Sequence, residues 1–359
     1  MGCGHETAQL TSRQAPTIGS VATASEARLP GLVTEPPPPQ REPPAKPPTH
    51  PFNLFAIPLG IAGLGGAWQA GRLTLHAPAW PAEVFYGVSA GIWSVLLLRY
   101  LANSFRYGSK GHFDKELRHP GNGPSVSFIP LVGILLSSHY IEYNKVFWSV
   151  LCLCFVIGLT LLGARLLAQW VTGGVTLEWV HPGYLLPVAA GPFIASIGFS
   201  TMGWPQAAIA AWGTGAFFWL VIGTVVTVRF MAGIQMPDEL KPVLAAYVAA
   251  PATACVAWIV IRPEGAGIIQ TGLTGILLMM ILMQVVLIPQ YARLPFSLTF
   301  WIFTFPVSTS ANYGIKWLRT VDVAGSELIS WGLLGVATAF VLGTGIRTLI
   351  YGSPAKKPR

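Results

Sequence analysis

A proline interrupts an apolar segment in the stretch Trp301-Ile302-Phe303-Thr304-Phe305-Pro306-Val307-Ser308-Thr309-Ser310-Ala311-Asn312. Proline lacks a backbone N–H, and its ring clashes with the carbonyl group one turn earlier in a helix. If such a helix crosses a bilayer, the freed carbonyl must find a partner in protein or in a water-filled cavity. The stretch therefore predicts a kinked transmembrane helix that faces other helices or a central pathway.

Four further apolar segments contain an interior proline, at Pro58, Pro130, Pro187 and Pro251. They alternate along the chain with apolar segments whose interiors lack proline. The alternation predicts five helical hairpins, in which the Pro-kinked helices form an inner ring around a central pore and the other helices surround it. We therefore expect an all-α integral membrane protein with ten transmembrane helices.

The composition supports a chain that crosses the membrane many times. Hydrophobic residues make up 52% of the chain and charged residues 10%, whereas soluble domains carry roughly 25% charged residues. Apolar runs of about 20 residues, the length that spans a bilayer, recur throughout. The predicted spans are 53–69, 82–103, 125–141, 146–170, 183–200, 205–230, 240–261, 266–290, 296–318 and 326–350.

The sequence divides into one membrane domain and two tails. Residues 1–51 include a Pro-rich stretch at 35–51 that cannot bury enough apolar surface to fold, so we expect a disordered cytoplasmic tail. Residues 52–351 are the predicted ten-helix channel or transporter domain. Residues 352–359 form a short basic cytoplasmic tail.

The net charge of +8 reflects the topology of the chain. With the amino terminus placed inside, 17 of the 22 Lys and Arg residues fall on the cytoplasmic side, as the positive-inside rule requires. We therefore expect a multi-pass protein of the cell (inner) membrane with both termini in the cytoplasm. Since the positive charge is explained by topology, no nucleic-acid partner is expected.

Ionisable groups are absent from the middle of the predicted spans. All fourteen acidic residues lie in the tail, in loops or at span ends, whereas proton-coupled carriers usually place an ionisable group at depth. This distribution favours passive flow, although His139 or a span-end carboxylate could still titrate. The histidines are too scattered for a metal site, and we expect no cofactor and no enzymatic activity.

Hydroxyl side chains are the predicted lining of the pore. Hydroxyls and helix ends coordinate anions weakly, which suits rapid conduction. The candidates in the proline-containing spans are Ser127, Thr253, Thr304, Ser308 and Thr309. The alternative is that these hydroxyls hydrogen-bond helices to one another.

Phe305 is a candidate gate, because it directly precedes Pro306. An aromatic ring that projects into the axis of a pore can close it by dewetting. The alternative is that this ring packs against a neighbouring helix.

Four parts of the chain resemble the tellurite-resistance and dicarboxylate transporter family, which includes bacterial TehA and the slow-type anion channels of plant guard cells. Each fragment is short, but their order and their placement on ten spans make the set specific. The resemblance covers residues 52–350. The matching residues are 57–60, 113–120 followed by 127–129, 181–187, and 301–305 with 311–312.

The resemblance implies ten helices arranged as five hairpins, a homotrimer with one pore in each protomer, and a gating phenylalanine at Phe305. This chain departs from bacterial TehA at two positions: Pro130 is shifted relative to the TehA proline, and Pro306 stands where TehA has glycine. Members of the family move chloride or nitrate, four-carbon dicarboxylates or sulfite, and some are linked to tellurite resistance. We therefore expect an anion channel, gated by Phe305, that passes small anions. The alternative is a coupled transporter or exporter of dicarboxylate, sulfite or tellurite-related oxyanions.

Overall fold

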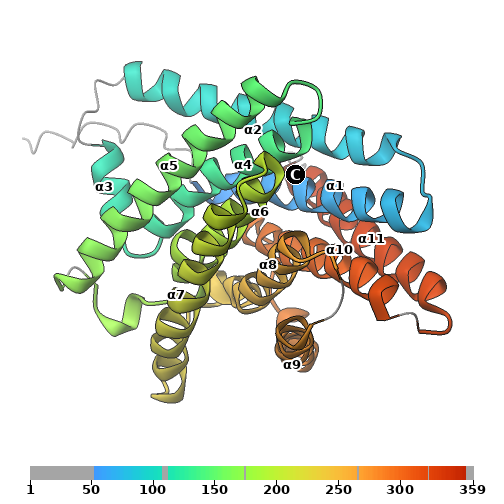
Figure 1. The fold of residues 1–359 in the computed structure, drawn as a ribbon. Coiled ribbons are helices and arrows are strands. Elements are labelled where there is room, and N and C mark those ends of the chain that lie inside the picture. The colour runs from blue at the N-terminus through green and yellow to red at the C-terminus, as the bar shows by residue number, and fades with distance from the viewer. Residues whose placement is uncertain (1–51, 107–111, 174, 265–266, 322, 353–359) are drawn as a thin grey trace, which may run out of the picture. The chain divides into compact units, whose positions relative to one another are not determined.

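The computed structural model describes residues 52–106, 112–173, 175–264, 267–321 and 323–352. Within these ranges every regular element is a helix, which confirms the predicted all-α fold (Figure 1). The predicted tail at 1–51, and all but the first residue of the one at 352–359, lie outside the described residues.

Two kinds of helix make up the described chain. The α-helices are α1 (Ala56–Leu75), α2 (Trp80–Arg106), α3 (His112–Arg118), α4 (Phe128–Tyr140), α5 (Lys145–Val171), α6 (Gly191–Met202), α7 (Pro205–Met231), α8 (Ala246–Ile261), α9 (Ile268–Tyr291), α10 (Thr304–Val321) and α11 (Ser326–Gly352). The short 3₁₀ or π-helical segments are η1 (Phe52–Phe55), η2 (Gly123–Ser127), η3 (Leu177–Trp179), η4 (Pro182–Tyr184), η5 (Leu186–Ala190), η6 (Asp238–Ala245) and η7 (Leu298–Phe303).

Eight helical segments of the described chain are long and apolar enough to cross a membrane, so the protein is a multi-pass membrane protein. The helices α4 and α10 are not among these eight. Helix α4 has only 13 residues, and α10 carries hydroxyl side chains together with Lys316 and Arg319. The count of ten spans therefore stays a prediction.

Five helices form a closed ring. Helix α1 contacts α4, α4 contacts α6, α6 contacts α8, α8 contacts α10, and α10 returns to α1 (Figure 1). The next helix in the chain packs on each of them: α2 on α1, α5 on α4, α7 on α6, α9 on α8 and α11 on α10. The elements thus pair as hairpins, with one helix of each pair in the ring.

Burial separates the two sets of helices. Three proline-containing spans are mostly buried: 72% of the apolar 18-residue stretch is buried in Phe52–Leu75, in Pro182–Met202 and in Asp238–Ile261. The corresponding share is 11–22% in the other five spans, in which proline occurs only near an end, and these spans expose Leu, Val, Ile and Phe side chains. A helix that exposes apolar side chains over most of its surface suits a lipid environment, so these five helices form the lipid-facing layer.

The prolines coincide with changes of helix type. Pro58, Pro130 and Pro306 are each the third residue of an α-helix that follows a 3₁₀ turn. Pro187 lies in the π-helical segment η5, and Pro251 lies within α8. In the first turn of a helix the missing N–H of proline costs no hydrogen bond. That these prolines kink the walls of a pore stays a prediction.

Helices α1 and α10 approach each other closely through glycine. A Cβ atom at Gly60 would lie 1.7 Å from the Oγ1 of Thr304, and one at Gly63 would lie 3.0 Å from Cδ2 of Phe305. Only residues without a side chain allow this separation. The contact fixes where Phe305 stands in the ring.

Candidate functional site: the central cavity

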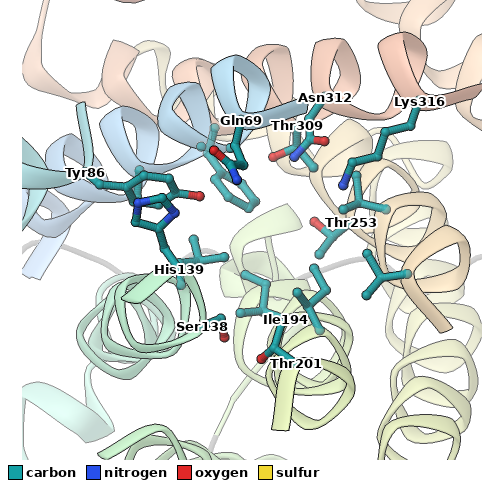
Figure 2. Close-up of a pocket in the computed structure, with 18 of the residues that line it drawn as sticks. Gln69, Tyr86, Ser138, His139, Ile194, Thr201, Thr253, Thr309, Asn312 and Lys316 are labelled. Carbon is teal, nitrogen blue, oxygen red and sulfur yellow. The ribbon is translucent and has the colours of Figure 1, made fainter. Parts of the chain in front are cut away.

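The five ring helices enclose a cavity of about 490 Å³ (Figure 2). Each helix lines it with side chains three or four residues apart, which is the spacing of one helical face. The α1, α4 and α6 faces include Gly63, Gly66, Gln69, Leu135, Ser138, His139, Ile194, Ile197 and Thr201. The α8 and α10 faces include Thr253, Val256, Val260, Phe305, Thr309, Asn312 and Lys316.

A second cavity of only about 10 Å³ is lined by the same five hairpins. Its walls are apolar and come from Ala56, Leu59, Phe128, Leu186, Ala246, Ala249, Trp301, Ile302, Phe305 and Pro306. A cavity must offer roughly 10–15 Å³ to hold one water molecule. The space within the ring is therefore wide on one side and nearly closed on the other.

Phe305 lies between the two spaces, since its side chain lines both. The residue is 6% exposed, and its ring packs over Gly63 of α1. Its position combines the two alternatives left open by the sequence, because the ring packs on a neighbouring helix and also lines the central space.

Two of the five predicted lining hydroxyls belong to the wall of the large cavity, namely Thr253 and Thr309. Ser127, Thr304 and Ser308 are buried and line neither of the two cavities. The Ser127 and Thr304 hydroxyls donate to the carbonyls of Pro124 and Trp301, each at 2.6 Å. Thr253 likewise donates to Ala249 O at 2.6 Å, so its hydroxyl proton is already used within the helix.

Charged side chains also line the large cavity, which sequence reasoning missed. They are Arg72, Glu83, Glu142 and Lys316. The expected uncharged pathway therefore describes the narrow cavity and not the wide one. The signal was present in α10, because Phe305, Thr309, Asn312 and Lys316 follow one another at steps of four, three and four residues, which places them on one helical face.

His139 and Glu83 form a polar pair in the wall of the cavity. The His139 Nε2 lies 3.1 Å from Glu83 Oε1. The His139 ring stacks on Tyr86 at a centroid distance of 3.8 Å and an interplanar angle of 13°; Figure 2 shows the two rings together. The pair joins α4 to α2 and places a titratable ring beside the cavity.

Two segments that carry the family resemblance, 113–120 and 181–187, are connected by hydrogen bonds at Pro120 and the adjacent Gly121. The Nε2 of His181 lies 3.2 Å from Gly121 O, and the Tyr184 hydroxyl donates to Pro120 O at 2.9 Å. His181 Nδ1 accepts from Gly183 N at 3.1 Å, so Nε2 carries the proton. Burial is the main cause that lowers the pKa of His181 to about 4. The motif therefore holds the loops together through a neutral histidine.

The described residues contain no group of three or more His, Cys, Asp or Glu side chains that could hold a metal ion. The titratable side chains of the cavity instead form one pair, Glu83 with His139, and isolated charges. The arrangement can therefore order water or a small ion around charged and amide groups.

The family model described as voltage-dependent anion channel matches residues 50–349. The chain is 26% identical over 317 residues to the guard cell S-type anion channel SLAC1 of Arabidopsis thaliana, which covers 84% of this chain and 55% of that protein. It is 27% identical over 308 residues to the S-type anion channel SLAH2 of the same plant, with coverage of 81% and 57%.

A bacterial relative matches along nearly its whole length. The chain is 24% identical over 313 residues to the tellurite resistance protein TehA homolog of Haemophilus influenzae, which covers 83% of this chain and 93% of that protein. In contrast, the chain spans about half the length of the plant relatives.

Proposed function

The chain belongs to the voltage-dependent anion channel family, and from this premise we propose that it is a transmembrane anion channel whose central cavity passes small anions and is closed by Phe305. The family membership confirms the resemblance drawn from the motifs, and the relatives bear the names of anion channels and of a tellurite resistance protein.

The observation that carries the proposal is the place of Phe305 between a wide cavity with charged, polar and apolar walls and a narrow apolar one. A hydrophobic constriction of this size holds at most about one water molecule, and an ion cannot leave its hydration shell there without a polar replacement. Movement of one ring would join the two spaces. The narrow cavity supplies no charged group that could trap an anion.

The proposal includes the placement of the chain in the membrane. The helices α4 and α10 cross the bilayer as the third and ninth of ten spans, since both belong to the ring that the other crossing helices complete. The protein lies in the cell (inner) membrane with both termini in the cytoplasm, as the distribution of Lys and Arg favours. The assembly is a homotrimer with one pore per protomer, which rests on the family resemblance.

Replacing the ring of Phe305 tests the gate. We expect Phe305→Ala to raise anion flux severalfold in proteoliposomes, because the constriction becomes wide enough for water. Phe303→Ala is the matched control, since Phe303 contacts the rings of Tyr291, Phe300 and Phe340 and lines neither cavity. Equal flux in the two variants, at equal protein incorporation, would contradict gating by Phe305.

A coupled transporter of dicarboxylate, sulfite or tellurite-related oxyanions is the second candidate, and the His139–Glu83 pair is the observation that favours it. A group that titrates beside the cavity can couple proton movement to anion movement. Flux that saturates with substrate and is driven by a pH gradient alone, and that is lost in His139→Gln, would establish this second function in place of the first.

A further inference from the structure

Lys316 is a cation in the wall of the large cavity that has no ion-pair or hydrogen-bond partner among the described residues. None of the ion pairs or hydrogen bonds of the described residues involves its ammonium group, and no carboxylate oxygen of those residues lies within 4.0 Å of it. In Figure 2 its side chain leaves α10 and reaches into the cavity toward Thr253. A positive charge held away from bulk water without a counter-charge favours a negative ligand beside it.

The position of the Lys316 ammonium group is set by helix α10. Lys316 follows Phe305 by eleven residues in α10, which corresponds to three turns and roughly 16 Å along the axis. Arg319 holds this end of α10 to α1, because its Nη1 donates to Leu73 O at 2.7 Å. The ammonium group is therefore set on the same helical face as the Phe305 ring, at the opposite end of the cavity.

Two side-chain amides beside Lys316 also lack partners. The buried Oδ1 of Asn312 and the buried Oε1 of Gln69 accept no hydrogen bond from the described residues. Figure 2 shows both amides directed into the cavity, Asn312 from α10 and Gln69 from α1. Gly66 makes room for Asn312, since a Cβ atom there would lie 3.0 Å from its Nδ2. The oxygens without partners are acceptors, and a flip of either amide would place its two N–H donors where the oxygen now lies, toward an anion in the cavity.

The negative side chains of the cavity come from other elements. Glu83 belongs to α2 and pairs with His139 of α4 at 3.1 Å, and Glu142 follows the end of α4. Lys316 and Asn312 belong to α10, and Thr253 belongs to α8. The cavity therefore has a side on which an anion would meet the ammonium group of Lys316 and the amides of Asn312 and Gln69, while the other cation of the wall, Arg72, is exposed at the end of α1.

We propose that Lys316, together with the amides of Asn312 and Gln69, forms a binding site for one small monovalent anion at the wide end of the cavity. The inference rests on the proposed function and deepens it, because it names the group that collects the permeating ion before it reaches Phe305. One fixed charge with neutral donors matches a halide or nitrate. A dicarboxylate would need a second cation, and the other cation of the wall, Arg72, is exposed at the end of α1.

The site has a consequence that conduction measurements can detect. A fixed positive charge concentrates anions from dilute solution, and high ionic strength screens the effect. Loss of the charge should therefore matter most at low chloride. We expect Lys316→Gln to lower chloride flux about tenfold in dilute chloride, and to leave flux near the wild-type value in concentrated chloride.

The matched control is Arg262→Gln, which removes one exposed positive charge from the residue that follows α8. Arg262 does not line the cavity, so its loss should leave the concentration dependence unchanged. Asn312→Asp is a second test that keeps Lys316 and the size of the side chain. A carboxylate one turn from the ammonium group would pair with it, and we expect the same loss of flux at low chloride.

Binding is measured separately from flux, by chlorine NMR line broadening on the purified protein in detergent. We expect chloride exchange with the wild type to broaden the line, and Lys316→Gln and Asn312→Asp to remove most of the protein-dependent broadening. Arg262→Gln should keep it. Lys316→Arg should restore at least part of it, because the charge is retained. If Lys316→Gln does not fold, Asn312→Asp alone decides the result.

The outcomes separate this inference from the proposed function. If the wild type conducts chloride and the Lys316 and Asn312 variants behave like Arg262→Gln in both measurements, the site is refuted and the channel stands. If the wild type does not conduct, but the broadening is lost in Lys316→Gln and kept in Arg262→Gln, the site stands and the channel is refuted.

Discussion

Two residues on one face of α10 have opposite chemistry. Phe305 lines a narrow apolar space, and Lys316 stands in the wide polar cavity. In the proposed channel, an ion that moves from one to the other would first meet a charge and then a ring that offers no polar group. Such an order would bind ions weakly and keep the barrier apart from the binding site.

His181 shows how one buried side chain couples the fold to pH. Its folded-state pKa is lowered to about 4, chiefly by burial, whereas the pKa of an unfolded histidine is about 6.5. The unfolded chain therefore binds more protons between these two values. The stability that neutral His181 supports is complete above about pH 6.5 and is lost as the pH falls toward 4.

We expect the wild type to lose up to about 2 kcal/mol of stability through His181 between about pH 7 and pH 5. His181→Asn should flatten this dependence, because asparagine does not titrate and its Oδ1 can accept from Gly183 N. Thermal unfolding in detergent at the two pH values measures the effect. His76→Asn, an exposed histidine with positive φ that asparagine tolerates, should leave the slope as it is.

At the level of elements, the two kinds of helix differ in what they bury. The ring helices follow 3₁₀ or π-helical turns and contain proline, whereas the outer helices run for 24 to 27 residues with proline only near an end. Side chains of the outer helices also bind ring carbonyls: Ser89 donates to Pro58 O at 2.7 Å, and Trp93 donates to Ile129 O at 3.0 Å. The outer layer thus supplies donors to an irregular inner layer, as a helix in lipid requires.

The α1–α10 contact leads to a prediction about packing. Gly60→Ala should destabilise the protein by about 1–3 kcal/mol, because the new methyl group overlaps Thr304 and forces the helices apart. Gly91→Ala is the control, since a Cβ atom at Gly91 in α2 meets no other group. Unfolding temperatures in detergent compare the two variants. Combining Gly60→Ala with Thr304→Gly should recover part of the loss, and a failure to recover any of it would contradict this contact as the cause.

At the level of the whole molecule, five hairpins close into one ring, in which α10 returns to α1. The closure encloses the cavity and brings side chains from five distant parts of the chain to one space. It also requires α4 and α10 to lie among crossing helices, although neither is long and apolar enough to be recognised by itself.

The ten-span topology predicts opposite sides of the membrane for the two ends of α4. In a background whose four cysteines are replaced by alanine, we expect Tyr143→Cys to react with a membrane-impermeant maleimide from outside the cell. His119→Cys should react only after the membrane is opened. Both positions are exposed in the described chain. Reaction of both from the same side would show that α4 does not cross, and the count of ten would be wrong.

The alternation of segments with and without proline was sufficient to predict the all-α class, the hairpin pairing and the helices that form the ring. These features follow from local chemistry, because proline and glycine suit buried, irregular helices, and uninterrupted apolar runs suit lipid. The kink at Pro306 and the family resemblance pointed to Phe305, which lines both the wide and the narrow cavity; its role as a gate stays a prediction.

The composition of the cavity wall was decided by the tertiary structure. Whether a hydroxyl lines the cavity depends on the rotation of its helix and on closure of the ring, so Thr253 and Thr309 face the space while Ser127, Thr304 and Ser308 do not line it. Lys316 occupies a span end in the sequence, where a charge needs no explanation. Only the tertiary structure shows that Lys316 lines the cavity, because the cavity exists only where four other helices close the ring with α10.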